Sequence, residues 1–202
     1  ESIVSTRTSY TFTMPSSNVT VSAKFEEIEL TIYTQYGEDG AASVSALYSR
    51  TQLEDLATTT ANPTTGYIYY KNDEWNAVVA TEYVTLDTLL FNAGISFSSG
   101  DSIKSFAGGD NFYDIVSYSN IQEYQYYFDP NNNGASTVTP FIIALRHGSG
   151  VLSGSSLSAI ASTASTTTLR SCYGCSEDQY NGVDGNYAMG RRLVSSVTSL
   201  TI

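Results

Sequence analysis

Both cysteines of the chain lie in the segment SCYGC, at Cys172 and Cys175, and His147 is the single histidine. A tetrahedral zinc site needs four ligands, more than these residues supply. A thioredoxin-like redox pair opens a helix after a strand, whereas the residues after Cys175 are typical of turns. Cysteines at i and i+3 can be bridged only in a turn. We therefore interpret the pair as a local disulfide or as two unpaired thiols, with metal or redox chemistry as a further alternative.

The segment DPNNNG carries a second chemical pattern. Asp129, Asn131 and Asn133, followed by Gly134, reproduce the first half of a calcium-binding loop. Pro140 stands where the bidentate glutamate of such a loop belongs. We interpret the segment as a polar turn before a buried strand, and a weak calcium site completed by carbonyls and distant carboxylates is the alternative.

Tyrosines lie beside carboxylates and amides in the segments EYQYYFD and GYIYYKNDEW. This mixture suits a sugar-binding surface, although most of these rings are expected to pack in sheets and core. Nucleophilic catalysis has little support, because no Gly-x-Ser-x-Gly turn surrounds a serine and His147 is the only imidazole.

The charge balance excludes some partners. The chain has 20 acidic against 9 basic residues and a net charge of −11, so it repels phosphate backbones and anionic membranes. We expect no nucleic-acid partner. No apolar run approaches the roughly 20 residues that span a bilayer, so we expect no membrane insertion in this segment, and any signal peptide or wall anchor outside it. The hydroxyl-rich composition is common in exported bacterial surface proteins.

The first 25 residues predict a β-hairpin. Apolar residues alternate in YTFTM and again in VTVSAKF, with Pro15-Ser16-Ser17-Asn18 between the two runs. This stretch resembles the closing segment of the divergent internalin-type B repeats of Gram-positive surface proteins, in which a Phe-Thr-Met-Pro turn precedes Asn-Val-Thr-Val. The resemblance implies a larger, secreted, multi-domain parent.

Residues 27–202 predict a β-rich α+β domain with mixed sheets. A strand is expected around 28–32, a helix in SRTQLEDLA with Glu54 and Asp55 in its first turn, and strands in GYIYY and NAVVATEYV. The clearest helix is VTLDTLLFNAG, capped by Thr85 and stopped by Gly94. Two strands around Ile103 and Tyr113, a short helix from Ser117 and the buried strand VTPFIIAL follow. Residues 148–168 are expected to form an exposed insertion, and 193–202 a final strand.

In this order, the segments VTLDTLLFNAGI, GDSIKSFAGGDNFYDIVSY, YYFDP, VTPFIIAL, LRSCYG and LVSSVTSLTI resemble elements of the molybdopterin-binding domain of the sulfite oxidase superfamily. Catalytic members hold molybdenum through a cysteine in the region that aligns with GYIYYKNDEW, which has no cysteine here. A phenol does not replace a soft thiolate ligand. The resemblance therefore implies the fold and argues against the oxidoreductase activity. It also places a candidate pocket rim, and thus a residual anion-binding cleft, at Tyr70, Arg146, His147, Arg170, Cys172 and Tyr173, although isolated basic residues at strand ends are more often solvated or paired.

These observations predict a repeat hairpin at residues 1–26 and a molybdopterin-binding-domain-like module at 27–202. We expect a non-catalytic, monomeric surface module of a larger bacterial protein, located at the cell surface or wall, that binds an extracellular glycan, small molecule or protein. No cofactor is expected, and molybdopterin is disfavoured, with calcium as the alternative. A divergent molybdopterin-dependent oxidoreductase and a purely structural spacer are the competing functions.

Overall fold

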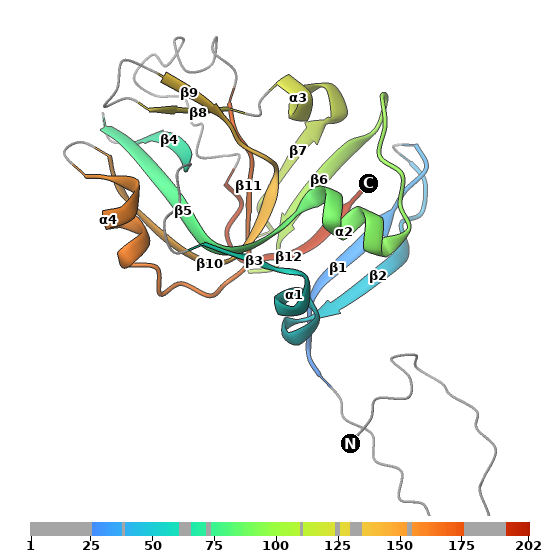
Figure 1. Cartoon of the computed structure of the whole chain (residues 1–202). Helices are drawn as coiled ribbons and strands as arrows, with labels where there is room; N and C mark the ends of the chain where they lie inside the picture. Colours follow the sequence, from blue (N-terminus) through green and yellow to red (C-terminus); the bar gives the residue numbers. More distant parts are fainter. Residues whose placement is uncertain are drawn as a thin grey trace, which may run out of the picture.

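The computed structural model describes residues 26–37, 39–60, 66–71, 74–109, 111–123, 126–129, 135–152, 155–175 and 193–202. In these ranges the chain forms two five-stranded sheets and one two-stranded sheet, with short helices around them (Figure 1). The prediction of a β-rich domain with mixed sheets is therefore confirmed. The predicted hairpin in the first 25 residues lies outside the described residues.

The first sheet has the strand order β2 (Ser43–Ser49), β1 (Ile28–Thr34), β12 (Val197–Thr201), β6 (Ser102–Ala107), β7 (Tyr113–Ser117). β1 and β12 are parallel, and the other neighbouring pairs are antiparallel. The predicted final strand is present but begins at Val197, and Leu193 and Val194 are buried ahead of it. The parallel pair thus joins the first and last described strands at the centre of this sheet.

The second sheet has the order β11 (Arg170–Cys172), β10 (Ile142–Val151), β5 (Glu74–Thr85), β3 (Thr58–Thr59), and β4 (Tyr67–Lys71) pairs with the other end of β5. The β5–β10 ladder is irregular between Ala144 and His147, where the pairing changes from Ala144 opposite Tyr83 to His147 opposite Ala80. Such an irregularity changes which side chains face which side of a sheet. It therefore decides where His147 points.

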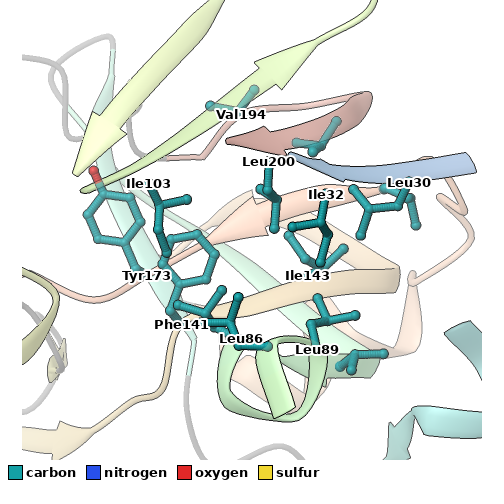
Figure 2. Close-up of a cluster of buried hydrophobic side chains, with 14 of the residues drawn as sticks. Leu30, Ile32, Leu86, Leu89, Ile103, Phe141, Ile143, Tyr173, Val194 and Leu200 are labelled. Atoms are coloured by element: carbon teal, nitrogen blue, oxygen red, sulfur yellow. The ribbon is translucent and has the colours of Figure 1, made fainter. Parts of the chain in front are cut away.

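The main core lies between the two sheets and the helix α2 (Leu86–Ala93). Figure 2 shows Leu86 and Leu89 of α2 facing Phe141 and Ile143, with Ile32 and Leu200 of the first sheet beyond them. The predicted ends of α2 are confirmed: the Thr85 side chain accepts a hydrogen bond from the backbone N–H of Thr88, and Gly94 adopts a left-handed conformation with φ of 68°. These caps place the apolar stripe of α2 on the core.

The helix α1 (Arg50–Leu56) is capped by Ser49, which forms a capping box with Gln52. The cap at Ser49 puts Glu54 and Asp55 beyond the first turn, so their predicted place in it was wrong. The predicted short helix after Ser117 is α3 (Tyr118–Glu123). The two-stranded sheet consists of β8 (Tyr126–Asp129) and β9 (Ala135–Val138).

Residues 148–168 are not simply the exposed insertion that their composition predicted. β10 continues through Val151, and the helix α4 (Leu157–Ser162) buries Ile160 and Ala161 against β5 and β10. Gly148 permits this approach, since a Cβ there would lie 2.4 Å from the backbone oxygen of Ile160. Small side chains at this contact, and not a linker, explain the low complexity of the segment.

Candidate functional site

The two cysteines pack in different parts of the molecule: Cys172 ends β11, whereas Cys175 lies beyond that strand and pairs with Tyr126 of β8. Cys172 packs in an apolar cluster with Tyr67, Val78 and Ile142, whereas Cys175 packs in a different cluster that includes Phe128, Leu152 and Ile160. Both side chains are buried, and no disulfide joins them. The interpretation as a local disulfide was therefore wrong, because the two cysteines pack in separate clusters and are not bonded to each other.

His147 lies on the same face of the sheet as Cys172. Its backbone pairs with Ala80, a member of the Cys172 cluster, and its side chain is only 4% exposed. The ring Nε2 donates a hydrogen bond to the Thr168 carbonyl at 3.2 Å, and Nδ1 has no hydrogen-bond partner among the described residues. Burial, and secondarily the nearby Arg170 charge, lower the pKa of His147 from 6.5 to about 4. The ring is therefore neutral at physiological pH.

Arg170 completes this cluster from β11. It alternates with Ser171, so its side chain shares the face of Cys172. Its guanidinium donates to the Ser195 hydroxyl at 2.5 Å, while its Nε has no partner among the described residues. Burial raises the pKa of the Cys172 thiol to about 12, although the Arg170 charge acts in the opposite direction. A thiol of this kind is neither a good nucleophile nor a ready metal ligand, because the thiolate is the reactive form.

The other three residues of the predicted pocket rim lie elsewhere. Tyr173 belongs to the main core: its ring stacks on Phe141 with centroids 5.4 Å apart, and its hydroxyl donates to Asp114 Oδ2 at 2.6 Å. Arg146 is exposed and pairs with Glu82 at 3.5 Å.

Tyr70 makes an edge contact with Trp75, whose ring packs against the cluster of Cys175. The structure thus brings together His147, Arg170 and Cys172, and it places Tyr70, Arg146 and Tyr173 apart from them.

Two long-range contacts had no sequence signal that singled them out. Asp114 ties β7 to the end of β11 through Tyr173. Arg50 donates from α1 to the backbone oxygens of Leu145 and Thr167 and pairs with Glu29 at 2.9 Å. A lone aspartate in a strand and a lone arginine at a helix start are common in sequences. Only the long-range pairing of strands shows which residues these two side chains contact.

The described residues contain no group of three or more His, Cys, Asp or Glu side chains that could hold a metal ion. Asn131 and Asn133 of the predicted calcium loop lie outside the described residues, and of Asp129 only the backbone, at the end of β8, is described. The calcium alternative therefore stays a prediction. Within the described part of the chain, no helix is long and apolar enough to cross a membrane.

The fold and this buried cluster define a β-rich domain with one mixed and one antiparallel five-stranded sheet and an internal His–Arg–Cys face. Residues 1–29 match the family model of a divergent InlB B-repeat domain. The predicted repeat at the start of the chain is therefore confirmed for that segment. No curated protein matches the chain.

Proposed function

We propose that the chain is a non-catalytic binding module of a bacterial surface protein. The observation that carries the proposal is the state of the two thiols: each is buried in its own apolar cluster, and Cys172 is held protonated. A divergent oxidoreductase would need one of them as a thiolate that is open to a metal. The neutral, buried His147 is equally unsuited to exchange protons with a substrate.

A degenerate molybdopterin-binding-type scaffold is the finer fold that we propose for residues 27–202. The order of the elements supports it: a capped helix, α2, leads to the β6–β7 hairpin, then to the buried strand β10 and the closing strand β12. The cell surface is the location that we propose. The match of residues 1–29 to a divergent B-repeat supports this location, because repeats of that kind occur in tandem on surface proteins.

Elemental analysis and pterin fluorescence of the chain purified from its native host test the proposal. The expected result is molybdenum and pterin far below one equivalent, together with thiols that do not react with a charged alkylating reagent until the protein is denatured. Stoichiometric molybdenum that is lost in Cys172→Ser but retained in Cys175→Ser would instead establish an enzyme.

A further inference from the structure

One face of the first sheet packs on the core, and the other carries two continuous rows of side chains across all of its strands. In the first row, each residue pairs with the next: Val44, Tyr33, Thr201, Lys104, Ile115. In the second row the order is Leu47, Thr31, Ser199, Phe106, Tyr113. The residues between them on the central strands, Ile32, Leu200 and Ser105, are buried on the core side. We call these ten residues the outer face.

The outer face is open to solvent at both ends. Val44 and Leu47 on β2 are 57% and 46% exposed, and Ile115 and Tyr113 on β7 are 55% and 51% exposed. Three aromatic rings and three hydroxyl side chains lie among them, the hydroxyls at the centre on β1 and β12. Lys104 lies over the Tyr113 ring, 4.1 Å from its centroid, which holds that ring in place. The face therefore offers fixed apolar surfaces beside hydrogen-bonding groups.

Charge restricts what such a face can bind. It contains one charged residue, Lys104, in a chain whose net charge is −11. An anionic polymer would be repelled by the whole molecule. A strongly cationic partner would find no carboxylate among the ten residues. An uncharged ligand fits best.

Area restricts the ligand further. On one face of a sheet, each residue occupies about 4.8 Å across the strands and about 7 Å along them. The ten residues on five strands therefore cover a flat area of roughly 300 Å². A stable protein–protein interface buries about 800 Å² of accessible surface on each partner, so these ten residues alone are too few to hold a second copy of the chain or another folded domain. A linear ligand lying along the rows needs no more than this.

From these observations we infer that the outer face binds a neutral polysaccharide laid across the strands, with sugar rings packed on Tyr113, Phe106 and Tyr33 and sugar hydroxyls bonded to the central serine and threonines. Sugar rings present apolar C–H faces, which pack on the electron-rich face of an aromatic ring, and hydroxyls at their edges. This inference rests on the proposed binding function and assigns it a surface and a ligand class.

Affinity electrophoresis of the whole chain tests the inference, in native gels that contain hydroxyethylcellulose, dextran, galactomannan or, as an anionic polymer, polygalacturonate. At least one neutral polysaccharide is expected to retard the wild type, and polygalacturonate is not. Tyr113→Ala should weaken the retardation about five-fold, because a ring contact of this kind contributes about 1 kcal/mol. Ile115→Asp should weaken it as well. Phe91→Ala is the matched control, since that ring is 85% exposed on α2, away from the outer face.

Three results overturn the inference. The first is that no neutral polysaccharide retards the wild type. The second is that Tyr113→Ala and Ile115→Asp are retarded as strongly as the wild type while their thermal midpoints match it. The third is that light scattering shows a dimer, which Ile115→Asp dissociates. The second result leaves the binding module in place and moves its site, whereas stoichiometric molybdenum would reject the proposed function itself.

Discussion

Acidification should destabilise this protein through His147. Its folded pKa of about 4 lies below the unfolded value of 6.5, so the unfolded chain binds more protons between these values. The contribution of the neutral His147 ring to stability is therefore fully present above pH 6.5 and is lost as the pH decreases toward 4. The cause is structural: protonation would place a charge on a ring that is 4% exposed and lies near the Arg170 guanidinium.

The size of the effect follows from the shift. A difference of about 2.5 pH units corresponds to about 3 kcal/mol of unfolding free energy, lost by pH 4. That is a large part of the roughly 5–15 kcal/mol by which a domain is usually stable.

Urea unfolding followed by the fluorescence of Trp75, the single tryptophan, measures the loss at pH 7, 6, 5 and 4. His147→Gln is the comparison, since a glutamine amide can still donate to the Thr168 carbonyl but does not titrate. Carboxylates contribute equally to both proteins. The wild type should therefore lose about 3 kcal/mol more than the variant between pH 7 and pH 4. Parallel pH profiles, or an NMR titration of the single imidazole with a pKa near 6.5, would refute the reasoning.

Three further predictions follow from the same face and its neighbours. Arg170→Met should raise the NMR pKa of the imidazole, because it removes the second cause of the shift, whereas Arg146→Met on the exposed side should leave it unchanged. Gly148→Ala should destabilise the protein by about 1–3 kcal/mol in urea unfolding, since its Cβ meets the backbone of α4, while Gly109→Ala, with nothing within 4 Å, should change stability little. Both cysteines should carry a label after alkylation in denaturant and neither after alkylation of the native protein, and a mass that shows a native disulfide would contradict the packing described.

Local patterns accounted for most of the elements. α2 was predictable from Thr85, the leucine spacing and Gly94, because caps and apolar periodicity act within a few residues. The alternation around Ile103 and Tyr113 likewise predicted β6 and β7. Composition misled at α4, where serine and alanine suggested an exposed insertion. Small side chains also allow a helix to approach a strand closely, and only the strand beneath it distinguishes the two outcomes.

The candidate site was predictable only in part. His147, Arg170 and Cys172 were selected and do share a face, but Tyr70, Arg146 and Tyr173 do not join them. Proximity in the chain was misleading for Arg146, since the neighbours of a strand residue point to the other side of the sheet.

By itself, the sequence determined the β-rich class, the repeat at the start of the chain, the acidic charge, and the absence of a cysteine between residues 66 and 75. Tertiary structure alone decided that the thiols are separated, that the imidazole is neutral, and that ten residues from five strands form one outer face. The reason is physical: composition and short-range periodicity are properties of neighbouring residues, whereas burial, pKa and the rows across a sheet depend on which distant strands pair and in which register.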